Sequence, residues 1–337
     1  MKKARHITGE MGGLKIAIDV GGTFTDVVLM DPATNAFHYT KTPTTHHDLS
    51  EGVLKGLREI LEVAAIKDTS SCHLIHGTTI GTNAIIEGKG ARVGLITTEG
   101  FEDVLEIRRV ARPREATFDF WVDNPPPLVP RYLRKGIRER IDKAGNVITP
   151  LDLSTLEKAI EIFKNEGVEG IAVVLLFAFL NPRHEQEIRS YLTESLPGVH
   201  ISLSSEICPE FREYERTSTT VMNAYLGPII KTYLDDLTVQ VKKRYPNFNI
   251  LIFQSNGGAM PVASAAAYAS NLINSGPAGG AIATAYVSRI TGNEMAIGMD
   301  MGGTTCDISV IDRGIPRTTT WGGVSEYPIK LPMIDLK

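Results

Sequence analysis

The chain has 337 residues, of which 42% are hydrophobic and 22% charged, a composition typical of a globular protein with room for two domains. Its net charge is −4 and its basic residues are spread along the chain, so neither nucleic acid nor a membrane surface is expected as a partner. The three cysteines, Cys72, Cys208 and Cys306, are far apart, which gives no indication of a disulfide framework or a structural zinc site.

Residues 1–13 are basic but lack the apolar stretch of a signal peptide, which predicts a disordered leader. Together with the free thiols, this favours a cytoplasmic protein. Two apolar runs at residues 14–20 and 24–30, separated by a glycine pair, predict a strand, a tight turn and a second strand. Apolar residues at helical spacing predict a helix over residues 49–66. Short strands are expected next, at residues 73–76 and 92–97.

Residues 112–150 contain many prolines and no clear periodicity, so we expect an irregular excursion that ends in a hairpin around residues 144–146. Strands and helices then alternate, which predicts an α/β fold with a parallel or mixed sheet. Helices are predicted over residues 154–165, 182–196, 210–245 (interrupted near Gly227 and Pro228), 261–269 and 277–290, and strands over residues 168–180, 199–205, 249–254 and 295–301.

One motif occurs twice. DVGGTFTD at residues 19–26 recurs as DMGGTTCD at residues 300–307, and six of the thirteen positions aligned from residues 19 and 300 are identical. Each copy follows one apolar strand and leads into another. A single copy is compatible with a plain tight hairpin that carries solvated acids. Two copies, both between apolar strands, instead predict two related domains that face one ligand.

The residue types in the repeat suit phosphate binding. Paired glycines let a hairpin approach a ligand closely, free backbone N–H groups attract an anion, and threonine hydroxyls add donors. The cofactor-binding residues predicted on this basis are Gly21, Gly22, Thr23, Thr25, Gly302, Gly303, Thr304 and Thr305.

Asp19 and Asp300 stand at the ends of apolar strands, one in each copy. Carboxylates in this position can hold Mg²⁺ through its waters and so neutralise polyphosphate charge. We therefore predict Asp19 and Asp300 as metal-binding residues. Phosphoryl transfer depends on the charge and position of the metal, so Asp300 is also predicted to be catalytic.

The paired hairpins resemble the two phosphate loops of the acetate kinase, sugar kinase, Hsp70 and actin superfamily. More specifically, four stretches resemble the hydantoinase A/oxoprolinase family. They are IHGTTIGTNA (75–84), GLITTEGFEDVLEI (94–107), ERTSTT (215–220) and NSGPAGG (274–280). With the two hairpins, these matches span residues 16–311. The resemblance implies an actin/Hsp70/hexokinase-like (ribonuclease H-like) fold with two lobes.

The resemblance also implies an ATP- and Mg²⁺-dependent enzyme that phosphorylates a carbonyl oxygen of a hydantoin, lactam or 5-oxoproline and so drives hydrolytic ring opening. The alternative within the family is a ketone (acetone or acetophenone) carboxylase subunit. A hydantoinase B-like partner subunit is implied in either case. A non-catalytic ATP switch, as in chaperones and filaments, is the alternative from another class.

Members of this family are longer than 337 residues, so the two-lobed fold is expected to be incomplete at the C-terminus. The resemblance divides the chain into an N-terminal domain over residues 14–200 and the start of a second domain over residues 201–337. A separate chain is one way to complete the nucleotide site, and without completion we expect weak ATP binding.

His76 ends a predicted strand and precedes a loop of glycine and threonines. It is predicted as a catalytic group that polarises a carbonyl or transfers a proton, with a structural histidine as the alternative. Thr78, Thr79 and Asn83 supply donors in the same loop and are predicted to contact substrate. Two other features remain open: a basic cluster at residues 108–114 and the neighbouring pair Glu215 and Arg216, each of which is either structural or close to the site.

Overall fold

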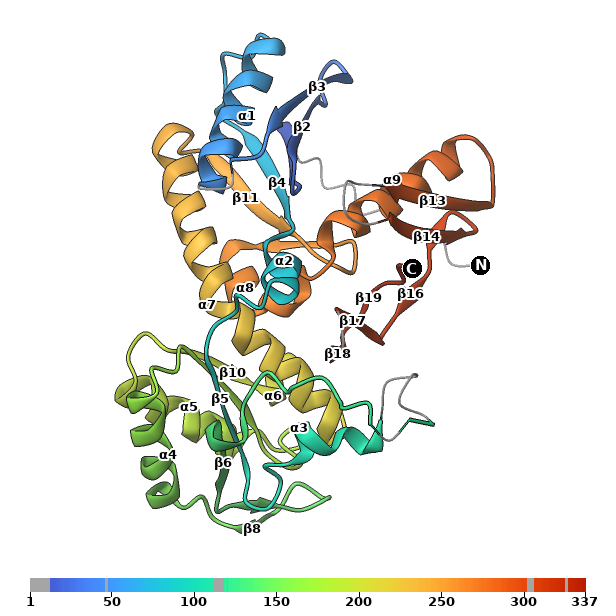
Figure 1. The fold of residues 1–337 in the computed structure, drawn as a ribbon. Helices are drawn as coiled ribbons and strands as arrows, with labels where there is room; N and C mark the ends of the chain where they lie inside the picture. Colours follow the sequence, from blue (N-terminus) through green and yellow to red (C-terminus); the bar gives the residue numbers. More distant parts are fainter. Residues whose placement is uncertain (1–12, 46–47, 112–117, 120, 302–305, 325–326) are drawn as a thin grey trace.

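The structure of the chain is a computed structural model (Figure 1). It describes residues 13–45, 48–111, 118–119, 121–301, 306–324 and 327–337. The fold is mixed α/β with several sheets, as the alternation of strand and helix patterns predicts. Within these ranges, no helix is both long enough and apolar enough to cross a membrane. The predicted leader lies outside the described residues up to residue 12.

A six-stranded sheet contains the first predicted hairpin. Its strand order is β12-β11-β4-β1-β2-β3. The strands are β1 (Leu14–Val20), β2 (Phe24–Asp31), β3 (Ala36–Pro43), β4 (Cys72–Thr78), β11 (Phe248–Phe253) and β12 (Ala259–Pro261). β1, β2 and β3 form an antiparallel meander, whereas β4 runs parallel to β1 and β11 runs parallel to β4. The strand, turn and strand predicted from residue 14 onward are therefore confirmed.

Helix α1 (Leu49–Val63) packs on the meander. Asp48 begins the helix by accepting a hydrogen bond from the backbone N–H of Glu51 at 3.1 Å. The buried face of α1 carries Val53, Leu57 and Ile60 at helical spacing. Each apolar side chain of this size contributes about 1.5–3 kcal/mol when it is fully buried. The amphipathic pattern thus fixes one covered face for the first three strands.

A second, four-stranded parallel sheet lies below the first in Figure 1 and has the order β10-β9-β5-β6. Its elements are β5 (Val93–Thr98), β6 (Arg134–Ile137), β9 (Gly170–Val174) and β10 (His200–Leu203), with α4 (Leu153–Asn165) and α5 (Arg183–Ser195). In sequence this unit is inserted between β4 and β11. The predicted boundary between residues 200 and 201 falls inside β10, and the division into two domains stays a prediction.

Helix α7 (Glu213–Arg244) runs along both sheets (Figure 1). The predicted interruption near Gly227 and Pro228 is wrong, because the helix continues through Pro228. Proline removes the N–H that would bond the carbonyl four residues earlier, at Ala224. The next carbonyl, that of Tyr225, accepts a bond from the Ala91 N–H at 2.9 Å, so the helix is held from outside at this point. Contacts with both sheets offset the cost of an internal proline.

The second copy of the repeat also folds as a meander. Its strands are β13 (Met295–Met301), β14 (Cys306–Asp312) and β15 (Ile315–Pro316), and α9 (Ser275–Ile290) packs on them. The register repeats as well: Asp19 pairs with Asp26 in the first copy, and Asp300 pairs with Asp307 in the second. The sequence repeat is therefore a structural repeat.

Shorter elements connect these units. They are α2 (Ile80–Ile86), α3 (Val104–Ile107), η1 (Arg108–Val110), η3 (Arg131–Leu133), β7 (Arg140–Ile141), β8 (Val147–Thr149), α6 (Ser204–Ile207), α8 (Val262–Ala267), η4 (Ala269–Leu272), β16 (Thr318–Thr319), β17 (Gly322–Val324), β18 (Tyr327–Ile329) and β19 (Met333–Ile334). The hairpin predicted at residues 144–146 is confirmed by β7 and β8. The strand predicted over residues 168–180 is shorter than expected, because Phe177 turns the chain with φ of 56°.

Candidate functional site

The turn of the first hairpin is open to solvent at Gly22 and Thr23. The Gly21 N–H closes the turn by donating to the Phe24 carbonyl at 3.0 Å. Thr44 holds it from the side, with its N–H bonded to the Thr23 carbonyl (3.0 Å) and its hydroxyl to the Gly21 carbonyl (2.9 Å). The turn is therefore braced before any ligand arrives.

Thr25 lies on the inner side of this hairpin. It is buried, and its hydroxyl lies 3.2 Å from that of Thr44. In this structure the predicted phosphate contact of Thr25 does not face solvent, and the residue supports the turn instead. The second turn, with Gly302, Gly303, Thr304 and Thr305, lies outside the described residues.

The loop after β4 lies against the first hairpin. The Thr79 hydroxyl donates to the Val20 carbonyl at 3.2 Å, and the Asn83 amide donates to Thr79 at 3.3 Å. Asn83 is exposed, whereas Thr78 is buried and its hydroxyl accepts a bond from the Ile80 N–H at 3.2 Å. The structure thus brings Thr79 and Asn83 to the first hairpin and places Thr78 behind them.

The start of α9 joins the same loop. Asn274, with φ of 58°, precedes the helix, and its N–H bonds the Thr82 hydroxyl at 3.1 Å. The Ser275 hydroxyl donates to the Thr78 carbonyl at 3.2 Å. Because the first N–H groups of a helix have no partner within the helix, this end of α9 favours negative charge.

Glycines of α9 face both carboxylates of the repeat. A Cβ atom at Gly276 would lie 3.6 Å from Oδ1 of Asp19, and one at Gly280 would lie 3.6 Å from Oδ2 of Asp300. Gly77, beside Asp19 in the sheet register, is closer still, since its Cβ would lie 3.1 Å from Oδ1. Glycine at these three positions leaves space around the two acids. Sequence reasoning did not assign Gly77, Gly276 or Gly280 to the site, although all three lie in stretches that it singled out.

The electrostatics of Asp19 show how close the two copies are. Burial by surrounding protein raises the pKa of Asp19, and the negative charges of Asp26 and Asp300 raise it further. The carboxylate is nevertheless open to solvent. Asp26 is already engaged, since the Tyr39 hydroxyl and the Lys41 ammonium donate to it at 2.5 and 3.0 Å. Asp19 and Asp300 make no hydrogen bond or ion pair with another residue that the structure describes, so a cation would relieve their repulsion.

The donor set fits Mg²⁺ better than a metal enclosed by protein. The described part of the chain holds no group of three His, Cys, Asp or Glu side chains that would enclose a metal ion. Mg²⁺ usually keeps several waters and uses one or two carboxylates together with substrate phosphates. Two solvent-open carboxylates on either side of a glycine-rich helix start meet this requirement.

His76 lies on the other face of β4 from this site. The register pairs Gly77 with Asp19 and His76 with Ile18, and successive residues of a strand point to opposite faces. The imidazole is fully buried, and its Nε2 lies 2.7 Å from the hydroxyl of Tyr233 on α7. Burial lowers the pKa of His76 to about 4, so the ring is neutral at pH 7. Asp19 and His76 are therefore not brought together.

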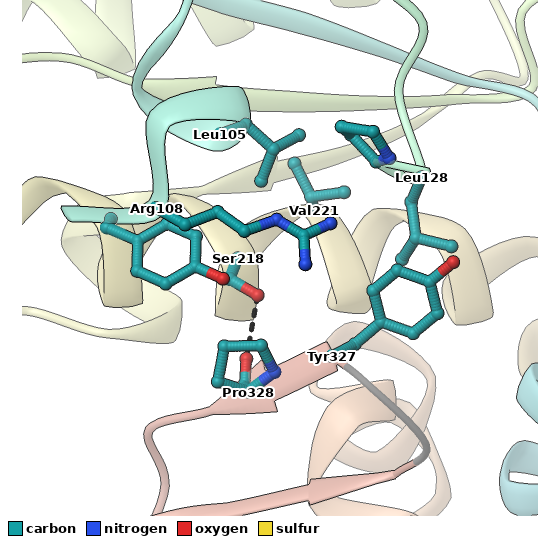
Figure 2. Close-up of a pocket in the computed structure, with 9 residues that line it drawn as sticks. Leu105, Arg108, Leu128, Ser218, Val221, Tyr327 and Pro328 are labelled. Atoms are coloured by element: carbon teal, nitrogen blue, oxygen red, sulfur yellow. Dashed lines mark hydrogen bonds between the residues drawn. The ribbon is translucent and has the colours of Figure 1, made fainter. Parts of the chain in front are cut away.

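The basic cluster divides between two buried contacts. Arg108 is buried and donates to the Pro125 carbonyl, and Arg109 forms an ion pair with the buried Glu215. Figure 2 shows Arg108 extending across a pocket beside Tyr327. That pocket has a volume of about 10 Å³, which is room for a water molecule but not for a substrate. The remaining arginines of the cluster, Arg112 and Arg114, lie outside the described residues.

Glu215 and Arg216 do not pair with each other along the helix. Arg216 is buried and donates to the Ser204 hydroxyl at 2.9 Å and to the Leu175 carbonyl at 2.7 Å. Glu185 accepts from the same hydroxyl at 2.6 Å. The two side chains of the ERTSTT stretch thus hold α7 to the inserted unit, with Glu215 binding Arg109.

These features define an α/β protein in which two equivalent acidic hairpins face the start of one helix. Residues 15–196 match the family described as hydantoinase/oxoprolinase N-terminal region, and residues 216–337 match hydantoinase/oxoprolinase. The chain belongs to the hydantoinase/oxoprolinase family.

Two relatives bear on the function. Caprolactamase subunit alpha from Pseudomonas jessenii is 36% identical over 96% of this chain and 47% of its own length. The crystal structure of the ATP-dependent caprolactamase from that organism superposes with a TM-score of 0.80 at 34% identity, over 96% of this chain and 47% of the other. The nucleotide-free structure of acetone carboxylase superposes with a TM-score of 0.85 at 25% identity, over the same shares of the two chains. The chain thus spans about half the length of these relatives.

Proposed function

We propose that this chain is a subunit of an ATP-dependent enzyme that phosphorylates a carbonyl oxygen of a cyclic amide and so drives hydrolytic ring opening. The observation that carries the proposal is the approach of Asp19 and Asp300 from two equivalent hairpins at the glycine-rich start of α9. Like charges in this arrangement are unfavourable unless a bound cation or a proton relieves them. Metal-bound ATP supplies that cation.

The duplicated meander supports the finer assignment of the fold. Two copies of the same three-stranded unit, each with its acidic hairpin directed to one place, are what the two-lobed actin/Hsp70/hexokinase-like fold requires. The proposed phosphate contacts in the first copy are the N–H groups of Gly22 and Thr23 and the Thr23 hydroxyl. In the second copy, residues 302–305 take the equivalent role.

In this proposal Asp19 and Asp300 hold Mg²⁺ through its waters, and the metal neutralises charge on the phosphates. The γ-phosphoryl group passes from ATP to the amide carbonyl oxygen and ADP leaves. Water then attacks the carbonyl carbon, the C–N bond of the ring breaks, and phosphate is released. Thr79 and Asn83, beside the first hairpin, orient the amide.

His76 is assigned a supporting role. Its ring is buried, neutral and bonded to Tyr233, on the face of β4 away from Asp19. A general acid or base has to come within hydrogen-bond reach of the reacting group, which this position does not permit. His76 instead fixes β4, whose end carries Gly77 and Thr79.

Ketone carboxylation is the second candidate, because the backbone superposes somewhat more closely on acetone carboxylase than on caprolactamase. Sequence identity favours the caprolactamase, at 34% against 25%. Identity reflects the side chains that contact a substrate, whereas a backbone superposition reflects the fold. Amide opening is therefore the first choice.

The test is ATP turnover by the chain purified with its hydantoinase B-like partner from the native source. Release of phosphate that depends on a lactam or hydantoin supports ring opening, and release that requires a ketone and bicarbonate supports carboxylation. Asp300→Asn should reduce turnover at least about a hundredfold, because it removes a metal-orienting charge. Asp312→Asn, at the far end of the same hairpin, is the matched control and should leave turnover unchanged. Turnover that needs neither substrate, or survives Asp300→Asn, contradicts the proposal.

A further inference from the structure

The two copies of the repeat differ sharply in what covers them. In the first copy the apolar residues Leu14, Ile16, Ile18 and Val20 of β1 are all at most 9% exposed. Their equivalents in the second copy, by alignment of Asp19 with Asp300, are Met295, Ile297, Met299 and Met301 of β13. These four side chains are between 60% and 73% exposed. Equivalent positions with the same apolar character are thus core in one copy and surface in the other.

The exposed side chains form one continuous face. Residues two apart in a strand point to the same side, so the four side chains of β13 share a face with Ile308 of β14, which pairs with Met299. The opposite face is covered, since a Cβ atom at Gly298 would meet Thr284 of α9 at 2.5 Å. In Figure 1 this sheet lies at the outer edge of the molecule, with α9 on one side. Contiguous apolar faces of this kind mark interaction surfaces rather than ordinary surface.

The edge of β13 differs in the same way. β1 is paired on both sides, with β2 and with the parallel strand β4. β13 is paired with β14 alone among the described strands and forms the edge of its sheet. An unprotected, apolar edge strand readily accepts another strand through its free N–H and carbonyl groups.

The first copy shows what such a surface accepts. There the covering elements are α1, which packs on β2 and β3, and β4, which pairs with β1. Gly56 of α1 permits a close crossing, since a Cβ atom there would lie 2.7 Å from Val27, the equivalent of Ile308. The surface therefore fits an amphipathic helix with a small residue at the crossing, followed by an apolar parallel strand.

We infer that the bare face and edge of β13 bind the part of the family polypeptide that lies outside the match, in the way that α1 and β4 cover β1. The caprolactamase alpha subunit has about half of its length outside the match, enough for such a unit. The inference rests on the repeat and on burial, so the outcome of the ATP turnover experiment does not affect it.

The test is co-expression of the 337-residue chain, carrying the only affinity tag, with the unmatched part of the Pseudomonas jessenii caprolactamase alpha subunit. We expect a one-to-one complex, and hydrogen exchange of the β13 amides at least about tenfold slower than in the chain alone. Ile297→Glu combined with Met299→Glu should abolish the complex, because it places charge on the covered face. Phe37→Glu, an exposed apolar position on β3 of the first copy, is the control and should retain it.

Three results would overturn the inference. The first is a complex that survives the double substitution. The second is a soluble co-expressed polypeptide that fails to co-purify and leaves the β13 amides unprotected. The third is a dimer of the chain alone with protected β13 amides, which would make a second copy the occupant. Both variants lie on exposed positions, and unchanged circular dichroism and exchange at β1 verify that they fold.

Discussion

Asp19 is held in an environment that suits a ligand better than the free protein. Its neighbours Asp26 and Asp300 carry the same charge, and surrounding protein reduces its solvation. Functional sites commonly contain such unfavourable arrangements, which the rest of the fold tolerates. The raised pKa of Asp19 is therefore evidence about the site as well as about the residue.

Asp19→Asn should stabilise the free chain at neutral pH and weaken its binding of magnesium nucleotide. A carboxyl group with a raised pKa holds its proton more tightly in the folded state, so its contribution to the free energy of unfolding falls as pH rises through that pKa. The gain is at most about 1 kcal/mol, because the carboxylate is open to solvent. Thermal unfolding at pH 7 checks the first effect and calorimetric titration with magnesium and ATP checks the second. A lower melting temperature would contradict this reading.

His76 gives a stability effect of the opposite sign in pH. Its pKa is lowered to about 4 in the folded chain from an ordinary value near 6.5, so between these values only the unfolded state takes up the proton. The chain should lose about 3 kcal/mol of unfolding free energy as pH falls through this window. In His76→Gln, which can still accept from Tyr233, that part of the pH dependence should disappear. Urea titrations from pH 4 to 7 measure it, with His73→Gln on the same strand as control. An unchanged pH profile in His76→Gln would refute the assignment.

At the scale of elements, the decisive contact is the crossing of β9 and α7. The carbonyl of Ala224, which Pro228 leaves without its helical donor, lies against Gly170, where a Cβ atom would come within 2.3 Å of it. The two elements can approach so closely because Gly170 has no side chain. The proline and the glycine, 58 residues apart in the chain, thus serve one contact.

Gly170→Ala should therefore destabilise the chain by about 1–3 kcal/mol, since the atom it would meet is backbone and cannot rotate away. Gly279→Ala in α9 is the control, because a Cβ atom there meets only the Phe253 ring at 3.7 Å. It should be neutral or slightly stabilising, as alanine is the better helix former. Midpoints of chemical denaturation compare the two variants. Equal stability of both would show that the crossing adjusts freely.

At the scale of the whole molecule, α9 lies between the two copies of the repeat. It contacts Asp19 near its start and Asp300 one turn later, while its body covers the second meander. A ligand that engages both acids thereby acts on both meanders at once. The coupling comes from one rigid helix and needs no longer chain of contacts.

Saturating magnesium and ATP should accordingly slow hydrogen exchange at β1–β2 and at β13–β14 together. Asp300→Asn should remove the protection from both hairpins, because the metal no longer links them. Protection confined to the first hairpin would show that the nucleotide contacts one copy alone. Asp312→Asn again serves as the control that keeps both protected.

Particular residues show how far the sequence predicts the structure. Both hairpins, the register that pairs each acid, and α1 follow from alternating or helical apolar spacing together with glycine pairs, which are local properties. The approach of Gly77, Gly276 and Gly280 to the acids was not predicted, because it joins segments more than 190 residues apart. The side of β4 on which His76 lies could not be read from its neighbours either, since it depends on which strand pairs with β4.

The sequence by itself determined the repeated hairpin, the alternation of strands and helices and the family, because each is written in the order and spacing of residues. Only the tertiary structure decided that α7 continues through Pro228, that His76 is buried and neutral, and that one copy of the repeat is covered while the other is bare. Those outcomes depend on which distant elements come into contact, and burial, which sets the pKa of a side chain and the exposure of an apolar face, exists only once they do.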